Sequence, residues 1–199
     1  MQKQFSNNRE INFKQLPTFW ALHKKKLHLQ HIMTEREIHN SIKELWKEAF
    51  GDSDEFIDSF LERFHTPGRM LAVWENGKLL SMLHVLPFVF EGYRAGYIYG
   101  VATAQDERDK GHATRLMQLA VEQARRDGLD ALVTIPASES LRGYYARLGF
   151  RGRYPVTFTD TGDFDPGTGD SSMNIAAVLP LKEISLPGDR CPVTLEWIG

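Results

Sequence analysis

The sequence has little cysteine, no long apolar run and almost no net charge, and each of these shortages excludes a class of protein. A single cysteine, Cys191, stands among 199 residues, which excludes an internal disulfide and a cysteine-rich metal site. No apolar stretch approaches the ~18 residues of a membrane-spanning helix, and a net charge of −2 provides no general attraction to nucleic acid. We therefore expect a cytoplasmic protein without a metal centre that binds neither membrane nor nucleic acid.

Two common nucleotide-binding signatures are also missing. The chain contains no Gly-Lys-Ser/Thr of a P-loop and no Gly-x-Gly-x-x-Gly of a dinucleotide-binding fold. Its composition is otherwise ordinary, because hydrophobic residues make up 42% and charged residues 25% of the total. These proportions favour one globular domain with a sizeable core over a disordered or repetitive chain.

Positive charge is concentrated at the start of the chain. Residues 1–32 contain six Lys or Arg and one acidic residue, a local charge of +5, which leaves −7 for residues 33–199. The segment lacks the apolar core of a secretory signal. Its histidines, His23, His28 and His31, do not share one helical face, so we expect no metal site there. We interpret residues 1–32 as a basic N-terminal extension without an assigned role and residues 33–199 as the folded domain.

Two amphipathic helices open the folded domain. Over residues 38–50 the apolar positions recur with helical spacing, and Gly51 is suited to end that helix. The next stretch keeps its apolar residues on one face as far as Phe64, and Asp52 with Glu55 forms a possible capping pair at its start. The pattern predicts two consecutive helices that each bury one face.

Strands and helices alternate in the rest of the domain. Asn76-Gly77 and Glu91-Gly92 are tight-turn signals between β-rich runs, so they predict three consecutive antiparallel strands. The elements that follow are a helix within residues 105–128, a strand over 129–135, a helix over 138–147 and a strand from Phe150. The order ααβββαβαβ predicts a mixed α/β fold, a sheet with an antiparallel N-terminal half and a parallel C-terminal half that is flanked by helices.

A loop rich in Gly and Asp occupies residues 160–172. Its carboxylates invite comparison with a calcium-binding loop, but the alternating ligand spacing and the closing Glu are missing. We therefore expect a solvated loop.

The helix within residues 105–128 begins without the usual polar cap. Its apolar residues form one stripe, and Gly128 is a typical residue to follow a helix end. Residues 108–113, however, read Arg-Asp-Lys-Gly-His-Ala, where a Ser, Thr or Asn is normally expected. One interpretation is an ordinary helix start capped by Asp109. The other is that the free N–H groups are kept for a ligand.

The residue types at this helix start favour an anionic ligand. Free N–H groups and the helix dipole together bind phosphate. Gly111 lets an oxygen approach the backbone, and Arg108 and Lys110 add positive charge. The segment also lies between a predicted strand and a helix. We therefore predict a pyrophosphate site.

Two motifs in this order resemble the GNAT superfamily of acetyl-CoA-dependent N-acyltransferases. Arg108, Gly111 and Ala113 match its Arg/Gln-x-x-Gly-x-Gly/Ala loop, and Tyr145 matches the tyrosine of its Tyr-x-x-x-Gly-Phe element. The resemblance covers about residues 38–155. The stretch ELWKEAFGDSDEFIDSFLERF is further similar to the two N-terminal helices of bacterial acetyltransferases of the enhanced-intracellular-survival type.

The resemblance implies where acetyl-CoA binds. Family members hold it where two parallel strands diverge, here residues 97–104 and 129–135, and backbone groups near Val101 and Thr103 would contact the pantetheine arm and polarise the thioester carbonyl. The pyrophosphate would lie on the backbone amides of Asp109, Lys110, Gly111, His112 and Ala113. Many relatives have Gly at position 109 and Asn at position 138, so Asp109 and Ser138 are departures from the pattern.

The resemblance also implies a mechanism. An amine attacks the thioester, the CoA thiolate leaves, and Tyr145 protonates it as a general acid. Tyr144 points ~100° away from Tyr145 on a helix, so only one of the two faces the cleft. The family often places a general base on the central strand, but residues 97–104 contain no acid. His84 and Glu91 are candidates, and neither is assigned.

These residues leave more than one function open. The first is an N-acetyltransferase that acts on a primary amine of a small molecule or protein. Many relatives are dimers, so the resemblance leaves a homodimer open. The second is a non-catalytic acetyl-CoA-binding module that acts through a partner. A nucleotide-binding regulator is disfavoured because both nucleotide signatures are missing. Replacement of Tyr145 by Phe separates the first two, since only the enzyme loses turnover.

Overall fold

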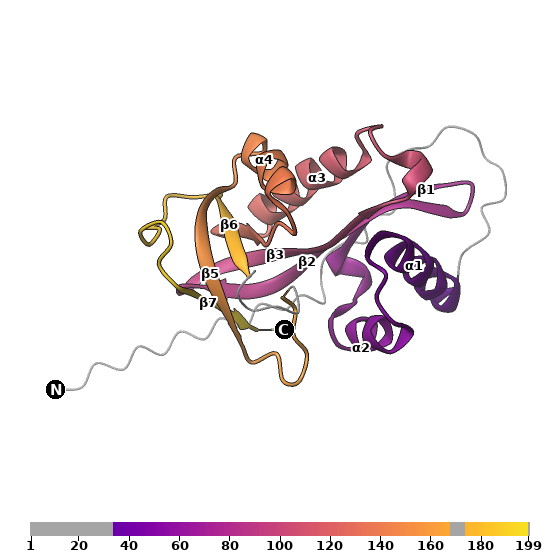
Figure 1. The fold of residues 1–199 in the computed structure, drawn as a ribbon, viewed down its shortest axis with the longest axis horizontal. Helices are drawn as coiled ribbons and strands as arrows, with labels where there is room; N and C mark the ends of the chain where they lie inside the picture. Colours follow the sequence, from indigo (N-terminus) through magenta and orange to yellow (C-terminus); the bar gives the residue numbers. More distant parts are fainter. Residues whose placement is uncertain (1–33, 168–173, 199) are drawn as a thin grey trace. The chain divides into compact units, whose positions relative to one another are not determined.

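The computed structural model describes residues 34–167 and 174–198 (Figure 1). The predicted extension, residues 1–32, lies outside this part of the chain, so the division into extension and domain stays a prediction. Within the described ranges, no helix combines the length and the apolar character needed to cross a membrane.

Helices α1 (Glu35–Phe50) and α2 (Asp54–Phe64) form where the apolar periodicity predicts them. Gly51 ends α1 in the left-handed conformation with φ 76°, which costs Gly little. The predicted capping pair at the start of α2 is wrong. Ser53, not Asp52, is the N-cap and accepts a hydrogen bond from the N–H of Phe56. Asp52 accepts one from Nε1 of Trp46 instead, at 2.8 Å, so its carboxylate joins the two helices.

Both predicted tight turns are confirmed. After a short 3₁₀ turn, η2 (Pro67–Arg69), strands β1 (Met70–Glu75), β2 (Lys78–Phe90) and β3 (Tyr93–Thr103) form an antiparallel meander. The two central residues of each turn have positive φ, 50° and 79° at Asn76-Gly77 and 47° and 81° at Glu91-Gly92. Positive φ at both centres is the requirement of a type I′ turn, whose twist matches that of the flanking strands.

The C-terminal half adds a 3₁₀ turn, two α-helices and four strands. These elements are η3 (Gln105–Glu107), α3 (His112–Arg126), β4 (Ala131–Thr134), α4 (Glu139–Arg147), β5 (Arg151–Thr159), β6 (Ile175–Pro180) and β7 (Val193–Trp197). The sheet has the order β1-β2-β3-β4-β6-β5-β7. The mixed sheet flanked by helices is confirmed, and β3, β4, β5 and β7 all run in one direction. Strand β6 lies antiparallel between β4 and β5.

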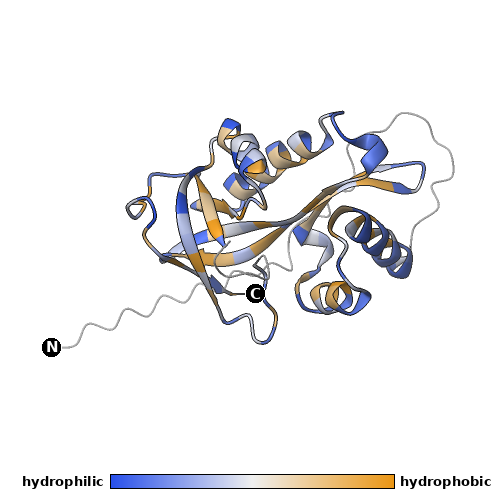
Figure 2. Ribbon diagram, viewed as in Figure 1, coloured by the Kyte–Doolittle hydropathy of each residue, from blue (hydrophilic) through white to orange (hydrophobic). Residues whose placement is uncertain are grey.

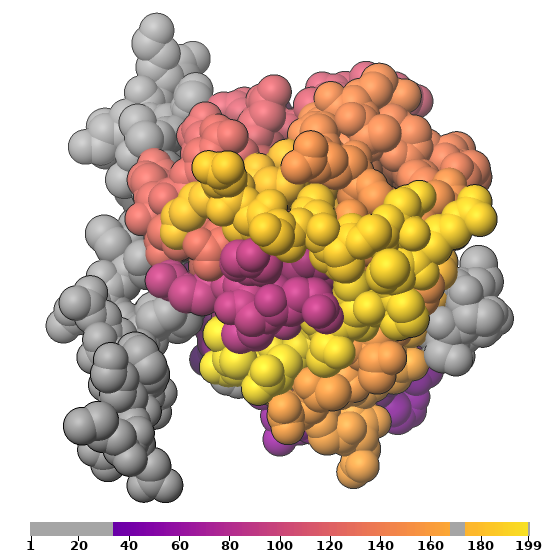
Figure 3. Space-filling view, turned by 90° about the vertical axis from the view of Figure 1, so that its left-hand side faces the viewer, coloured from indigo at the N-terminus to yellow at the C-terminus, as the bar shows by residue number. Residues whose placement is uncertain are grey.

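The last strand closes the sheet on itself. β7 pairs with β5 on one side and with the end of β2 on the other, where Phe88 lies opposite Trp197. Figure 3 shows the yellow C-terminal segment against the magenta end of the β2–β3 hairpin. Strands β2 to β7 therefore form a ring, and β7 has no unpaired edge to attract another strand.

The sheet separates two hydrophobic clusters. On one face α1 and α2 contribute Trp46 and Phe60, and on the other α3 and α4 contribute Leu116 and Tyr145. Figure 2 shows hydrophobic residues along the central strands and hydrophilic ones on the outer turns of α1. Each large apolar side chain buried in this way stabilises the fold by about 1.5–3 kcal/mol, so both faces are held firmly against the strands.

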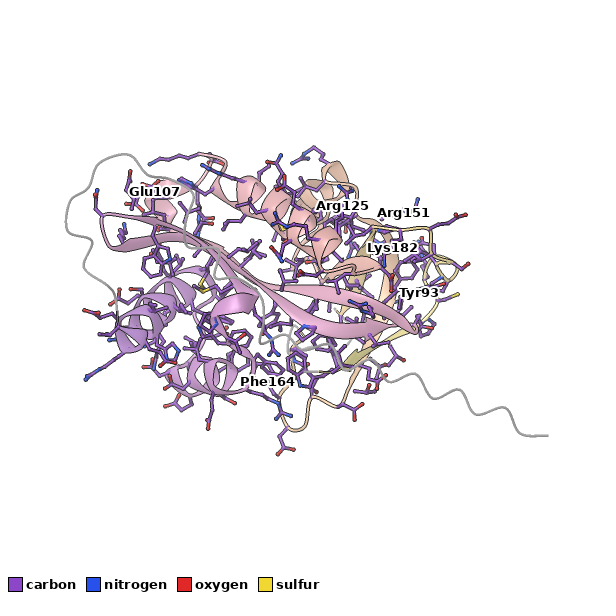
Figure 4. All side chains as sticks on the ribbon, turned by 180° about the vertical axis from the view of Figure 1, so that it is seen from behind. Tyr93, Glu107, Arg125, Arg151, Phe164 and Lys182 are labelled. Atoms are coloured by element: carbon purple, nitrogen blue, oxygen red, sulfur yellow. The ribbon has the colours of Figure 1, made fainter. Side chains whose placement is uncertain are left out.

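The predicted solvated loop is confirmed in part over its described residues, because Asp160, Gly162, Asp163 and Asp165 are exposed but three others are buried. Thr161, Phe164 and Pro166 are buried, and the Phe164 ring lies 5.1 Å from that of Phe56 and 4.8 Å from that of Phe64, between centroids. The loop folds back because α2 presents an aromatic surface that Phe164 covers (Figure 4). Residues 168–172 of this prediction lie outside the described residues.

Candidate functional site

Strands β3 and β4 diverge at one point, which we call the vertex. They pair in parallel from Ala95 opposite Ala131 to Ile98 opposite Thr134, and β3 then continues to Thr103 without β4 beside it. A bulge bends β3 just past the vertex, because the register with β2 shifts between Met82 and His84. Gly100 lies in this bulge with φ 57°, a conformation that Gly adopts without strain.

The predicted binding residues Val101 and Thr103 lie on this diverging end of β3. Both are partly exposed, whereas Ala102 between them is buried. The Thr103 carbonyl accepts a long hydrogen bond, 3.4 Å, from Nε of Arg108. A strand end that has lost its neighbour offers backbone N–H and C=O groups to a ligand, so this stretch can pair with an extended molecule.

The start of α3 lies next to that strand end and has no side-chain cap. Gly111 is its N-cap, with φ 82°, and no side chain accepts from the first-turn N–H groups. Asp109, with φ 62°, does not cap the helix, so the ordinary-start interpretation is wrong. A Cβ placed on Gly111 would meet no protein atom within 4 Å. The helix start therefore presents free N–H groups in open space, a geometry that binds anions.

A carboxylate that the sequence analysis did not single out hydrogen-bonds to Lys110 and His112. Glu107 accepts hydrogen bonds from Nζ of Lys110 at 2.8 Å and Nε2 of His112 at 3.1 Å. Lys110, and after it His112, lower the pKa of Glu107. The ring of His112 is thus held by Glu107, which leaves its backbone N–H for a ligand. Arg108 and Ala113 complete the segment, so all six predicted residues from 108 to 113 are contiguous on this edge.

Tyr145 lies at the vertex itself. Its side chain is buried, 6% exposed, on α4, and its hydroxyl hydrogen-bonds to the side chain of Thr134, the last paired residue of β4. Burial raises the pKa of Tyr145 to about 12, and the bond to Thr134 opposes the rise. The hydroxyl therefore stays protonated over the working range of an enzyme and can donate a proton.

Tyr144 and Ser138 have other contacts. The Tyr144 hydroxyl lies 3.4 Å from Oγ1 of Thr114, in the first turn of α3. Ser138 is the N-cap of α4 and accepts from the N–H of Leu141 at 3.2 Å. The two adjacent tyrosines thus point to different places, as their 100° separation on a helix requires.

Of the two candidate bases, only His84 lies near the vertex. Glu91 belongs to the β2–β3 turn and accepts from the N–H of Thr194 at 2.7 Å. Figure 4 shows Tyr93, which follows that turn, and Glu107 at opposite ends of the sheet. His84 lies opposite Tyr99 on β2 and is fully buried. The position of Glu91 removes it as a base.

The buried His84 predicts a fall in stability in acid. Burial, and after it the neighbouring His65, lower the pKa of His84 from 6.5 to about 3. Below pH 6.5 His84 binds a proton in the unfolded chain but stays neutral in the folded protein. The free energy of unfolding therefore decreases as the pH is lowered, by about 2 kcal/mol at pH 5. Urea unfolding at pH 7 and pH 5 measures this loss. It should be about 2 kcal/mol smaller in His84→Gln, and an equal loss in both proteins contradicts the prediction.

The comparisons with known proteins agree with this geometry. The model of the acetyltransferase (GNAT) domain family matches residues 31–152. A GNAT family N-acetyltransferase from Escherichia coli, solved with CoA, shares 17% identity over 88% of this chain and 94% of its own, with a TM-score of 0.58. One from Brucella melitensis, solved with acetyl-CoA, shares 17% over 79% of this chain and 90% of its own, with a TM-score of 0.53.

A third solved structure is a much longer protein. The GCN5-related N-acetyltransferase from Anabaena variabilis shares 18% identity over 61% of this chain but only 31% of its own, with a TM-score of 0.51, so this chain spans less than a third of its length. At such identities the likeness shows a common fold. The comparison with curated proteins finds no match.

The family match covers more than half of the chain, which therefore belongs to the GNAT family of acetyltransferases. The superfamily inferred from Arg108, Gly111, Ala113 and Tyr145 is confirmed. The family is one of acetyltransferases, and two of the solved structures that share this fold contain CoA or acetyl-CoA. The branch, a homodimer and the cytoplasmic location stay predictions.

Proposed function

We propose that this chain transfers the acetyl group of acetyl-CoA to a primary amine by direct attack, with Tyr145 as the general acid. The observation that carries the proposal is the position of the Tyr145 hydroxyl, at the vertex where β3 leaves β4 and on the same side of the sheet as the uncapped start of α3. A proton donor and an anion site are thus aligned along one strand end.

Between the start of α3 and the diverging end of β3, the protein offers a suitable binding group for each part of acetyl-CoA. The free amides of residues 109–113 suit the pyrophosphate. Backbone groups of Val101 and Thr103 suit the pantetheine arm, and the Val101 N–H suits the thioester oxygen, where it stabilises the negative charge that develops during attack. The open space around Gly111 admits a phosphate oxygen. Asp109 and Glu107 place carboxylates near the same site, so we expect salt to affect binding.

Proton transfer to the leaving thiolate fits the environment of Tyr145. Its raised pKa alone would make the transfer to a thiolate of ordinary pKa, ~8.5, unfavourable. A thiolate released at the vertex is desolvated as well, and burial raises the pKa of a thiol for the same reason. The difference between the pKa of Tyr145 and that of the CoA thiol is therefore smaller in the folded site than their separate values indicate.

A thermal melt tests the binding half of the proposal. At a hundredfold excess over its dissociation constant, acetyl-CoA should add about 2.7 kcal/mol to the free energy of unfolding, a rise in Tm of about 5–10 °C for a domain of this size. ATP and NAD are the controls and should leave Tm unchanged. No shift with acetyl-CoA, or an equal shift with ATP, contradicts the pyrophosphate site.

Thiol release tests the catalytic half. Butylamine, tyramine and spermidine differ in size and charge, and turnover of any of them with acetyl-CoA supports the proposal. Binding of acetyl-CoA without turnover of any amine favours the alternative, a non-catalytic acetyl-CoA-binding module that acts through a partner.

A further inference from the structure

Three histidines lie in a row from α1 to the buried strand β2. The rings of His39 on α1 and His65 at the end of α2 meet edge to face, with centroids 5.3 Å apart. Nδ1 of His65 then lies 3.2 Å from Nε2 of His84. His39 and His65 are partly exposed, whereas His84 is fully buried. The row therefore connects solvent to the interior of the sheet.

The inner end of the row is an unsatisfied nitrogen. Nδ1 of His84 is buried, and no described residue is within hydrogen-bond distance of it. A Cβ built on Gly100 would lie 3.6 Å from this Nδ1, next to the edge of the Trp46 ring, whose atoms would be at 3.1 and 3.2 Å. Gly100 is the bulge residue directly before Val101. A buried polar atom without a hydrogen-bond partner destabilises the fold by about 1–3 kcal/mol. Nδ1 of His84 is such an atom, and it lies next to the proposed reaction centre.

The hydrogen-bond pattern favours one tautomer. Only one of the two nitrogens that join His65 to His84 can carry the hydrogen. If Nδ1 of His84 carried it, that N–H would be an orphaned buried donor, which is rarer than an orphaned acceptor. The tautomer with the hydrogen on Nε2, donated to His65, leaves Nδ1 of His84 as a bare acceptor near Gly100.

We propose that His84 and His65 form a relay that removes the proton from the acceptor amine and releases it to solvent beside His39. This inference rests on the proposed acetyl transfer. As the amine nitrogen bonds to the acetyl carbon, its proton moves to Nδ1 of His84, directly or through one water. The Nε2 proton of His84 moves to Nδ1 of His65, whose own Nε2 proton leaves to solvent beside His39. Before the next turnover solvent returns a proton to Nε2 of His65, the Nδ1 proton of His65 moves back to Nε2 of His84, and the Nδ1 proton of His84 leaves to the emptied cleft. The C–S bond breaks, and the sulfur takes the hydroxyl proton of Tyr145, which solvent replaces.

The surroundings suit a relay better than a base that stores the proton. The titratable groups around His84 are His65, at the end of α2, and Tyr99, on β3, while α1 and α2 present the rings of Trp46 and Phe60. Burial lowers the pKa of both histidines, to about 3 for His84 and about 4 for His65. Each ring is therefore neutral above pH 5 and must release one proton as it accepts another.

Tyr99 lies opposite His84 in the β2–β3 pair. Burial, and after it Asp52 and Asp165, raise the pKa of Tyr99, so it stays neutral and does not compete for the proton. With His84 and His65 neutral, kcat/KM should show no limb from either imidazole between pH 5.5 and 8 and should rise with deprotonation of the amine.

The test variant is His65→Asn. An Asn side chain places an oxygen where Nδ1 of His65 stands, so it can accept from Nε2 of His84 but cannot pass a proton on. We expect kcat with acetyl-CoA and the best of the three amines to fall about 20-fold, with KM for acetyl-CoA unchanged and a larger solvent deuterium isotope effect. Phe64→Leu is the control, because it disturbs the same packing and leaves the row intact. Equal kcat values in His65→Asn and wild type overturn the relay.

A second measurement does not depend on a variant that folds. Nitrogen NMR of the histidine-labelled wild-type protein should show Nδ1 of His84 without a proton and Nε2 with one. A protonated Nδ1 overturns the relay in the stated direction. If the wild type turns over none of the amines, the proposed function fails and the relay with it. If it turns over an amine while His65→Asn keeps its kcat, only the relay fails.

Discussion

Replacement of Tyr145 by Phe is expected to lower kcat by about 10³-fold and to leave the affinity for acetyl-CoA unchanged. General acid catalysis contributes typically 10²–10⁴-fold, and Phe removes only the hydroxyl from a side chain that is otherwise packed against Phe150 on the α3–α4 face. Thiol release under saturating acetyl-CoA measures kcat, and the melt with acetyl-CoA measures binding.

The adjacent tyrosine provides a matched control. Tyr144 is on the same helix, but its hydroxyl lies beside Thr114 and not at the vertex. Tyr144→Phe should therefore change kcat by no more than about threefold, a loss of about 0.6 kcal/mol. If both variants keep full activity, water protonates the thiolate and Tyr145 is a packing residue. Because the pKa of Tyr145 is about 12, wild-type kcat should not fall on the basic side below pH 10.

Replacement of Gly111 by Asp should weaken acetyl-CoA binding by about 10²–10³-fold with little loss of stability, because the gain at the helix start offsets the strain of a side chain at φ 82°. Asp tolerates the left-handed conformation better than most residues, and the space around Gly111 contains no protein atom that its Cβ would meet. A negative charge at a helix N-terminus stabilises the helix by about 0.3–1 kcal/mol. The same carboxylate repels a pyrophosphate about 5 Å away by about 3–4 kcal/mol at an effective dielectric constant of 20, so Kd should rise by about 10²–10³-fold.

Gly128, at the other end of α3, provides a control substitution with the opposite expected effects on stability and binding. Gly128 has a similar φ, 72°, and equally open space for a Cβ, but it follows the C-terminus of the helix, where a negative charge destabilises. Gly128→Asp should therefore lower the free energy of unfolding and leave acetyl-CoA binding intact. Isothermal titration gives Kd and urea unfolding gives stability for both variants. If Gly111→Asp binds as tightly as wild type, the pyrophosphate does not lie on this helix start.

Features that depend on short stretches of chain were predictable from the sequence. The turns at Asn76-Gly77 and Glu91-Gly92, the end of α1 at Gly51 and the amphipathic face of α3 each follow from a few adjacent residues and the φ values or periodicity that they favour. The open start of α3 belongs to this group. Its composition predicted that no side chain would cap it, and the structure has none.

Features that depend on contacts between distant segments were not predictable in this way. Strand β6 enters between β4 and β5, and Phe164 turns a polar loop back onto α2, because each covers a surface that other elements create. The Glu107–His112 hydrogen bond was also not predicted, since the sequence of a polar loop does not show which of its side chains pair with one another.

The sequence by itself determined the family and the order of the elements from α1 to β5, because motifs and periodicity are local properties of the chain. Only the tertiary structure decided the chemistry at the vertex. Burial raises the pKa of Tyr145 and lowers that of His84, and burial is a property of the packed protein. The contact between His65 and His84 joins residues that are 19 positions apart. This contact forms because α2 lies across β2. That packing places His84 at the inner end of the three histidines His39, His65 and His84.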